Sequence, residues 1–490
     1  MKPVSMQRRA FLFAPLLYGP LHAQKAFKDP SPPKINTPAG APVKGQKNED
    51  VRLHRAPAPL SKTAITEDWT SFLGIRHNGT SRETGLKKKF PYSGPPLVWE
   101  MSKGTGYSSP AIAGDKLVFV HRKGAEEVIE CLHPETGERY WQHTYPTSFE
   151  DRYGYNNGPR SSPVIDADRV YVVGAECKLH CLHLPTGRVI WRRDLQKEFN
   201  VPQDFFGVAS TPLIEEDLLI VNVGAPGGPS VAAFHKLTGK MSWGAGTQWG
   251  ASYASPIPAT IHGKRRIFVF AGGESRPPAG GLMMLDPATG VIDFSFPWRS
   301  KSYESVNASC PVIFDNNVFI SASYKTGGAM LEITPDFKLK VRWTTPEFGL
   351  HFNTPIYKDG YLYGFDGRNE PDASLACIEA ATGKVAWRTN PEWKDTFEMG
   401  GEQREQLLST YRGNLLHVDG RFLALGEFGH LLWMDLTPAG YKEISRAWLF
   451  AARETWSLPV LSRGLLYIVQ HSRDVIHQKG PRLLCYDLRA

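Results

Sequence analysis

A strand-like run that leads through a Thr-Gly turn to a Trp or Phe recurs along this chain every 50 residues or so. Clear copies end at Trp141, Trp191, Trp243, Phe294 and Trp387, and weaker copies end at Trp343 and Trp448. In the first copy, for example, Thr136-Gly137 precedes Trp141. A period of about 50 residues with short strands and Gly turns is typical of a β-propeller, in which each repeat forms one four-stranded blade.

The two ends of the repeat region predict how the ring closes. The last repeat begins near Trp456, but the chain stops at Ala490 before reaching another Trp. The missing element occurs ahead of the first complete repeat, where Trp99 lies in the strand-like run 96–100. Pairing of that run with the C-terminal strands would leave no open sheet edge, and open edges promote aggregation. We therefore expect an all-β, eight-bladed propeller over residues 97–490.

A second marker, a small residue followed by Pro, occurs upstream in each repeat. It is found at Ser109-Pro110, Ser162-Pro163, Thr211-Pro212, Ser255-Pro256, Cys310-Pro311, Thr354-Pro355 and, more loosely, Leu458-Pro459. Because Pro has no N–H, a sheet tolerates it at the start of a strand. The marker therefore predicts the start of the innermost strand of each blade, and only the seventh blade, near Tyr411, lacks it.

The N-terminus is expected to be an export signal over residues 1–23. Basic residues precede an apolar stretch from Ala10 to Leu21, and a small-residue cleavage site follows. Arg8-Arg9 matches the twin-arginine export pattern, with an ordinary secretory signal as the alternative. We therefore expect a periplasmic or secreted protein. The apolar stretch is too short to span a bilayer, and no later segment is long enough, so we do not expect an integral membrane protein.

Two further segments precede the propeller. Residues 24–62 are rich in Pro and Lys, which predicts a disordered linker. Residues 63–96 regain aromatic side chains, including Trp69 and Phe72, and we expect this segment to pack on the propeller. Six cysteines occur, but four of them, Cys131, Cys181, Cys377 and Cys485, occupy the same position in different repeats. Equivalent positions of neighbouring blades are too far apart for a disulfide, so we expect small buried side chains.

The net charge of +8 lies outside the propeller. Residues 1–23 carry three basic side chains, residues 24–62 carry eight against three acidic ones, and the remainder has 46 of each sign. A balanced propeller has no general attraction for phosphate backbones. We therefore expect no nucleic acid partner, and we expect a monomer.

The repeat resembles the tryptophan-docking repeat of the quinoprotein family, the eight-bladed propellers of pyrroloquinoline quinone (PQQ) alcohol dehydrogenases. Their relatives include the propeller lipoprotein of the outer-membrane β-barrel assembly machinery. The segments 158–163, 351–355 and 361–367 further resemble exported proteins described as PQQ-binding-like β-propeller repeat proteins. The resemblance covers residues 97–490 and implies a fold, because one scaffold hosts unrelated functions. The dehydrogenases hold the quinone against a ring of two adjacent bonded cysteines, and this chain has no Cys-Cys pair.

Ligands of propellers bind at the mouth of the central channel, which the first residues of the innermost strands surround. Counting three residues back from each marker Pro gives Tyr107, Arg160, Ala209, Tyr253, Ala308, Phe352 and Trp456. Beside them lie Asn157, Phe206, Trp249, Glu304, Asn307, His351 and Asn353. The rings either fill the channel or form a stacking platform with Arg160 as an anion clamp.

Candidate residues for chemistry are few. Glu304, Asn307 and Asn353 carry the oxygen atoms that Ca²⁺ prefers, although Asn near a strand start more often caps a turn. Glu304 or His351 would be the general base of an enzyme. No phosphate-binding loop, zinc spacing or Gly-x-Ser-x-Gly turn occurs.

Two functions follow from these patterns. The first is a non-catalytic exported propeller that binds a protein partner or a small ligand through its channel face. The alternative is a dehydrogenase with PQQ and Ca²⁺ that oxidises an alcohol or sugar.

Overall fold

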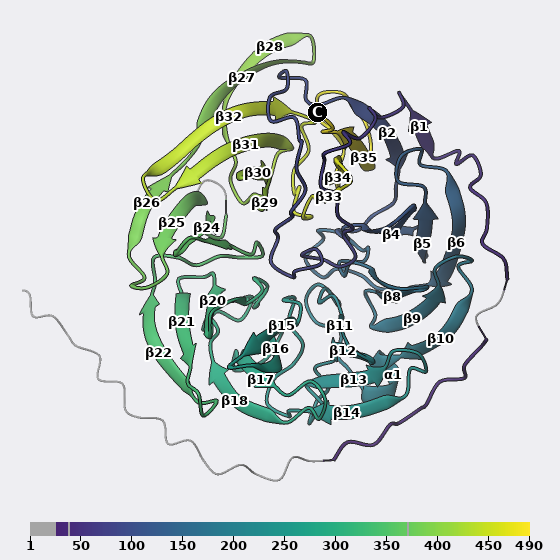
Figure 1. The fold of residues 1–490 in the computed structure, drawn as a ribbon, viewed down its shortest axis with the longest axis vertical. Coiled ribbons are helices and arrows are strands. Elements are labelled where there is room, and N and C mark those ends of the chain that lie inside the picture. Colours follow the sequence, from purple (N-terminus) through teal and green to yellow (C-terminus); the bar gives the residue numbers. More distant parts are fainter. Residues whose placement is uncertain (1–25, 38–39, 370–371) are drawn as a thin grey trace, which may run out of the picture.

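The strands form a closed ring of eight sheets around one axis (Figure 1). The computed structural model describes residues 26–37, 40–369 and 372–490. In these residues there is one helix, the short α1 (Leu195–Phe199). The expected all-β, eight-bladed propeller is confirmed. No helix of the described ranges combines the length and the apolar character that crossing a bilayer requires.

Each blade has four antiparallel strands, numbered outward from the axis. Blades 1 to 4 consist of β3 (Ala111–Ala113), β4 (Lys116–Lys123), β5 (Glu126–Leu132) and β6 (Arg139–Pro146); β7 (Val164–Asp166), β8 (Arg169–Val173), β9 (Lys178–His183) and β10 (Val189–Asp194); β11 (Leu213–Glu215), β12 (Leu218–Asn222), β13 (Val231–His235) and β14 (Met241–Ala245); β15 (Ile257–Ile261), β16 (Lys264–Ala271), β17 (Gly281–Leu285) and β18 (Ile292–Pro297).

Blades 5 to 8 follow the same order. They consist of β19 (Val312–Phe314), β20 (Asn317–Ala322), β21 (Gly327–Ile333) and β22 (Leu339–Thr345); β23 (Ile356–Lys358), β24 (Tyr361–Asp366), β25 (Ser374–Glu379) and β26 (Val385–Thr389); β29 (Asn414–Val418), β30 (Arg421–Leu425), β31 (His430–Thr437) and β32 (Gly440–Trp448); β33 (Val460–Ser462), β34 (Leu465–Gln470), β35 (Arg482–Asp487) and β2 (Leu97–Ser102).

The ring closes in blade 8 as the sequence predicts. Strand β2 pairs antiparallel with the C-terminal strand β35, so that Trp99 lies opposite Cys485. A further strand, β1 (Val51–Leu53), pairs with the outer edge of β2. The two ends of the propeller are thereby joined in one sheet, and neither leaves its neighbouring strand unpaired.

An outer ring of indole contacts joins neighbouring blades. In six blades the Trp of the fourth strand donates its Nε1–H to a carbonyl of the next blade, at the turn between that blade's third and fourth strands. The distances are 2.7 to 3.0 Å. The pairs are Trp99 and Pro134, Trp141 and Leu184, Trp191 and Lys236, Trp243 and Pro287, Trp343 and Ala380, and Trp387 and Thr437. The Thr-Gly signature follows from this contact, because the indole packs against the turn Gly. At Gly187, for example, a Cβ would lie 2.5 Å from Trp141.

An inner ring of hydrogen bonds explains the small residue before each marker Pro. Its backbone N–H donates to the side chain of the equivalent residue in the next blade. The series runs from Ser109 to Ser162, Thr211, Ser255, Cys310 and Thr354, with distances of 3.2, 3.0, 2.9, 3.3 and 3.1 Å. Blade 8 has Leu458 at this position, and its carbonyl accepts from the Ser109 hydroxyl instead. The marker therefore specifies contacts between blades as well as strand starts.

The marker Pro residues immediately precede the innermost strands in seven blades, as expected. Blade 7 is the exception, and its β29 follows Gly413 without a Pro. Apolar side chains fill the space between blades, such as Tyr171 and Trp191 of blade 2 against Leu219 and Phe234 of blade 3. All six cysteines are buried, and none of them forms a disulfide.

The interpretation of Trp448 as the docking residue of blade 7 is wrong. In blade 1, for example, the docking Trp141 lies opposite Cys131 of the third strand. The equivalent position of blade 7 is occupied by Ser445, which lies opposite Trp433. The equivalent carbonyl in blade 8 is that of Leu488, which accepts the N–H of Lys87 from the N-terminal segment at 2.8 Å. Ser445 instead donates to the carbonyl of Lys88, and Trp448 stacks on His430.

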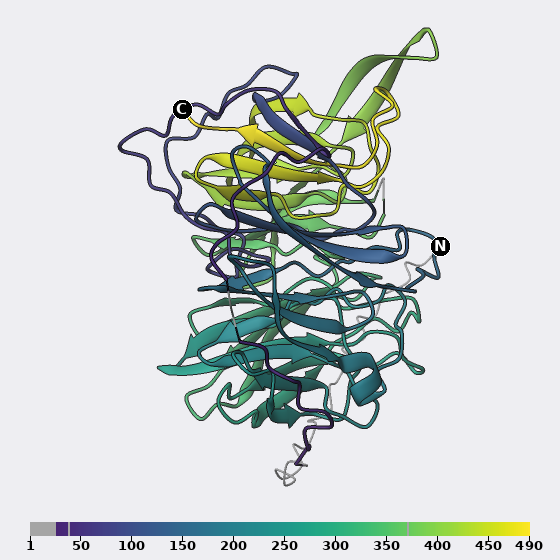
Figure 2. The same ribbon diagram turned by 90° about the vertical axis from the view of Figure 1, so that its right-hand side faces the viewer.

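The sequence did not predict a two-stranded hairpin between blades 6 and 7. Strands β27 (Glu392–Met399) and β28 (Glu402–Ser409) pair only with each other and extend beyond the ring (Figures 1 and 2). The base of the hairpin contacts blade 7 at His430, which lies 2.8 Å from the Asp395 carboxylate and 3.2 Å from the Nε1 of buried Trp393. Charged residues interrupt the alternation of apolar and polar side chains along this segment, so the sequence pattern does not distinguish it from a loop.

The described residues between 26 and 62 run along the outer rim of blades 3, 2 and 1 (Figure 1). Asp29 forms an ion pair with Arg193 at 2.6 Å, and the N–H of Asn36 donates to Ile190 at 2.7 Å. Apart from β1 they form no strand or helix. This segment forms no core of its own, but its backbone forms hydrogen bonds with the blades.

The segment that follows crosses one end of the channel. Trp69 is buried and pairs with Ile112 of blade 1, and the carbonyl of Thr70 accepts from Ile165 of blade 2. Farther along, Thr80 pairs with His417 of blade 7. These contacts lie on the innermost strands, at the end away from the marker Pro residues.

We predict that Thr211→Val destabilises the propeller while Thr211→Ser does not. Val keeps the shape of Thr but removes the oxygen that accepts the N–H of Ser162, which is buried. An unpaired buried N–H costs roughly 1–3 kcal/mol. Chemical denaturation of the two variants measures the difference, and equal midpoints would show that the inner ring contributes nothing.

We predict that Gly187→Ala costs more stability than Gly114→Ala. Both glycines have a positive φ, +70° and +57°, and left-handed backbone costs Ala roughly 1–2 kcal/mol. Only at Gly187 does the added Cβ meet an indole, since Gly114 has nothing within 4 Å. The clash should add roughly 1–3 kcal/mol. Thermal unfolding of the pair provides the measurement.

Candidate functional site

A cavity of about 210 Å³ lies on the axis at the marker end of the channel. All eight blades contribute to its wall. The lining residues are Phe72, Tyr107, Tyr155, Arg160, Phe206, Ala209, Tyr253, Val306, Ala308, Tyr324, His351, Phe352, Arg368, Asn369, Arg412, Trp456 and Ser457. Phe72 belongs to the N-terminal segment that crosses the opposite end. The cavity is therefore open at the mouth and ends on Phe72.

The aromatic rings around the cavity contact one another. Trp456 stacks on Tyr107 with ring centroids 5.4 Å apart, and it also contacts Phe352 at 5.4 Å and Tyr155 at 5.6 Å. Phe206 contacts Tyr155 in turn, at 6.0 Å. Such pairs stabilise one another beyond the area they bury. The belt of rings narrows the channel without filling it.

The polar atoms of these rings are bound within the protein. The Tyr107 hydroxyl donates to Glu454 at 2.6 Å, and the Trp456 indole donates to Glu427 at 2.7 Å. The Tyr253 hydroxyl accepts the N–H of Phe206 at 3.0 Å. Donors and acceptors are thus already paired, and carbon surfaces form much of the wall.

Three arginines line the cavity, but they differ in what they pair with. Arg160 forms an ion pair with the buried Asp151 at 2.5 Å, and Arg412 donates Nε–H to the buried Glu427 at 3.0 Å. Arg368 is exposed, and its guanidinium lies over the Tyr324 ring, 4.1 Å from the centroid. In the described part of the chain no carboxylate forms an ion pair with it.

The predicted site residues divide into two groups. Nine of them line the cavity: Tyr107, Arg160, Phe206, Ala209, Tyr253, Ala308, His351, Phe352 and Trp456. Asn157 instead is exposed and accepts the N–H of Asp151, while Trp249 packs between blades 3 and 4. The expectation that Arg160 is a free anion clamp does not match its ion pair with Asp151.

The candidate calcium ligands do not line the cavity. Glu304 is exposed, whereas Asn307 and Asn353 are buried. The amide nitrogen of Asn307 donates to the carbonyls of Ala271 and Trp298, at 2.8 and 2.9 Å, and its oxygen has no partner. No cluster of three or more His, Cys, Asp or Glu side chains suited to a metal occurs in the described ranges. The described residues that line the cavity include no carboxylate or thiol, so they offer no ligand set for a calcium-bound quinone.

His351 lines the cavity but is a weak base. Burial, together with the nearby Arg412 and Arg368, lowers the pKa of His351 to about 3. General bases work best with a pKa near the working pH. At neutral pH the imidazole of His351 is therefore uncharged, and its Nδ1 has no hydrogen-bond partner among the described residues.

The residues predicted to line the channel do not include Tyr155, Tyr324, Arg368 and Arg412, and the sequence predicts Arg368 on a solvated loop between a second and a third strand. Tyr324 and Arg368 lie two residues beyond the ends of β20 and β24, the second strands of their blades. A count from the marker Pro reaches only the approach to the first strand. The loops after second strands converge on the same mouth, and inspecting them would have found both.

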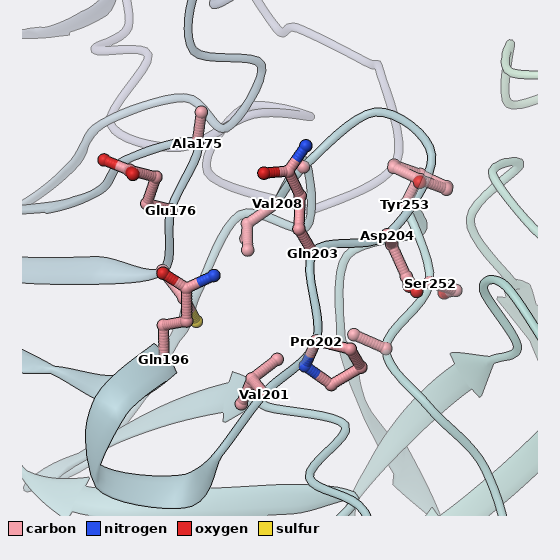
Figure 3. Close-up of a pocket in the computed structure, with 13 residues that line it drawn as sticks. Ala175, Glu176, Gln196, Val201, Pro202, Gln203, Asp204, Val208, Ser252 and Tyr253 are labelled. Atoms are coloured by element: carbon pink, nitrogen blue, oxygen red, sulfur yellow. The ribbon is translucent and has the colours of Figure 1, made fainter. Parts of the chain in front are cut away.

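A second, smaller cavity of about 20 Å³ lies next to the first and shares Tyr253 with it (Figure 3). Asp204 lines it beside Ser252 and Tyr253 (Figure 3). Burial, and then repulsion by Glu274, raises the pKa of Asp204 to about 7. A space of this size holds about one water molecule.

We predict that Asp204→Asn removes a pH dependence of stability. Because the folded-state pKa of Asp204 is raised from 3.8 to about 7, the folded protein loses stability as pH rises between these values. The loss is roughly 1.4 kcal/mol for each unit of pKa difference. Asn has no such titration, so the variant should gain on the wild type between pH 4 and 7. Denaturation curves across this range measure the gap, and parallel profiles would contradict the shift.

Comparisons with known proteins agree with this architecture. BamB from Moraxella catarrhalis has a TM-score of 0.50 and 14% identity, covering 80% of this chain and 97% of its own. A europium-containing methanol dehydrogenase has a TM-score of 0.59 and 11% identity, and the match covers 86% of this chain and 98% of that one. A quinohemoprotein alcohol dehydrogenase from Comamonas testosteroni has a TM-score of 0.57 and 12% identity, and the match covers 86% of this chain and 81% of that one. These likenesses concern the fold.

Sequence comparison is more specific. None of the curated proteins matches this chain. A family model described as "Outer membrane protein assembly factor BamB" matches residues 125–389, which is more than half of the chain. The chain therefore belongs to this family of PQQ-like β-propellers.

Proposed function

We propose that this protein is a non-catalytic scaffold that binds a protein partner through the channel mouth. The observation that carries the proposal is the blind cavity, whose lining is mainly aromatic rings and arginines and includes no Asp, Glu, Lys or Cys among the described residues. Chemistry on a substrate requires acids, bases or nucleophiles facing it. Here the carboxylates around the mouth, such as Glu427 and Glu454, are bonded to the cavity's own rings.

The size of the cavity favours a protein partner over a free small molecule. Small-molecule sites generally occupy about 300–1,000 Å³, whereas this cavity has about 210 Å³. Exposed Tyr and Arg side chains surround it, with Tyr153 and Tyr155 46% and 48% exposed. Tyr, Trp and Arg supply most binding energy at protein interfaces, and their partners insert anchor side chains into pockets between them.

Membership of the family supports the same conclusion. The family model is described as an assembly factor, which is a protein-binding role. We further propose that the protein acts outside the cytoplasm. The predicted export signal in residues 1–23, which lie outside the described residues, supports this location. A monomer that presents one mouth is the simplest form of such a scaffold.

The dehydrogenase alternative has less support. The described residues of the cavity wall include no carboxylate, the ligand type that a quinone-bound calcium ion would draw on. Dye-linked oxidation of an alcohol or sugar by purified protein supplied with PQQ and Ca²⁺ would restore that alternative and overturn the scaffold proposal.

We predict that a photo-crosslinking amino acid at position 155 traps a specific protein in cells, and that the same group at position 341 does not. Tyr155 lies at the mouth, while Val341 is 46% exposed on the outermost strand of blade 5. The control has similar exposure but faces away from the channel. The readout is the set of crosslinked adducts by mass spectrometry.

A Trp456→Ala background provides the second control, because it removes the ring that contacts Tyr107, Tyr155 and Phe352. The adduct at position 155 should diminish in this background. Identical adducts at both positions, or none at position 155, would contradict binding at the mouth.

A further inference from the structure

The interior of the mouth cavity has the dimensions of one aromatic ring. A cavity of about 150 Å³ lined by apolar side chains holds a benzene molecule. The present cavity, at about 210 Å³, accommodates a single ring and a few further atoms. Its deeper wall includes Phe72, Val306 and Ala308, which offer no hydrogen bonds from their side chains. Burial of an aromatic side chain is therefore favourable here, and burial of a polar one is not.

At the edge of the cavity, Arg368 forms no ion pair with any of the described residues. Asp151 and Glu427 neutralise Arg160 and Arg412. Arg368, in contrast, is exposed, and its position over the Tyr324 ring orients the planar guanidinium. A guanidinium held in this way presents a fork of N–H donors, which matches the two oxygens of a carboxylate.

The charge of the surroundings favours a monoanion. Glu454 and Glu427 are bonded to rings of the cavity wall, through Tyr107 and Trp456. Arg368 balances one negative charge, and a dianion such as phosphate would place an additional charge near these carboxylates. A carboxylate is thus a better match than a phosphate group.

On the basis of the proposed function, we propose that the mouth recognises the C-terminal residue of its partner, with an aromatic side chain in the cavity and its α-carboxylate on Arg368. In a C-terminal aromatic residue, ring and carboxylate are only a few bonds apart, as the cavity and Arg368 require. The residues that precede it in the partner would lie over the exposed Tyr153 and Tyr155. These contacts distinguish a peptide from a free aromatic acid, which could not reach them.

Binding of synthetic peptides to the full-length protein tests this inference. The probes are a Ser-Gly-Ser-Gly-Phe peptide with a free C-terminal carboxylate, the same peptide with a C-terminal amide, the Ser-Gly-Ser-Gly-Gly free acid, and N-acetylphenylalanine. Isothermal titration calorimetry gives each dissociation constant. We expect the free-acid Phe peptide to bind at least about tenfold more tightly than its amide, which lacks the charged hydrogen-bonded pair, and than the Gly peptide, which buries no ring.

Arg368→Gln should abolish the preference for the free acid, while leaving the thermal midpoint unchanged because the side chain is exposed. Arg453→Gln is the matched control, since Arg453 is also exposed but does not line the cavity. It should retain the full preference. Equal loss in both variants would show that only the general charge of the face matters, and would overturn the role of Arg368.

The outcomes also separate this inference from the proposed function. If crosslinks form at position 155 but acid and amide peptides bind equally, recognition of a C-terminus is wrong and the scaffold proposal stands. If N-acetylphenylalanine binds as tightly as the Phe peptide, the ligand is a small aromatic acid and the inference fails. If no adduct forms and no peptide binds, both proposals fail.

Discussion

Contacts between blades hold this ring together, and they take a repeated polar form at two radii. At the outer radius an indole N–H donates to the next blade's turn, as Trp141 does to Leu184. At the inner radius a backbone N–H donates to the next blade's hydroxyl or thiol, as Ser162 does to Thr211. Each contact satisfies a group that would otherwise be buried without a partner, which is expensive. Blades of weakly similar sequence therefore adopt one spacing, and that spacing determines the diameter of the channel.

The repeat allowed much of the fold to be predicted because these contacts restrict residue type. A turn against which an indole packs requires Gly, and an inner position that accepts an N–H requires a small polar side chain. Trp99 could be assigned to blade 8 for the same reason, since the last repeat reaches no aromatic residue at that position. The assignment failed at Trp448, because the equivalent carbonyl of blade 8, that of Leu488, accepts the N–H of Lys87. A Trp at about the right distance then has another role, on His430.

The site was predictable only in part. Counting from the marker Pro placed Tyr107, Phe352 and Trp456 at the mouth, because the ring symmetry makes these positions converge. The same count could not show that Arg160 is committed to Asp151, since that partner lies nine residues away on an irregular loop. Arg368 lies beyond a second strand, in a loop whose path does not follow the repeat. Loop conformation, not blade geometry, decides which charges remain available.

Closure of one channel end has the largest consequence for function. An open propeller channel is a passage, in which a ligand is contacted from the sides alone. Here Phe72, carried by a segment that also pairs with blades 1 and 7, provides a floor. In the proposed mode of binding, a ring inserted from the mouth would be enclosed by the cavity wall and by Phe72, with Arg368 at the entrance. An apolar floor and one charge at the entrance specify both the side chain and the direction from which it enters, so a chain terminus suits this cavity better than an internal segment.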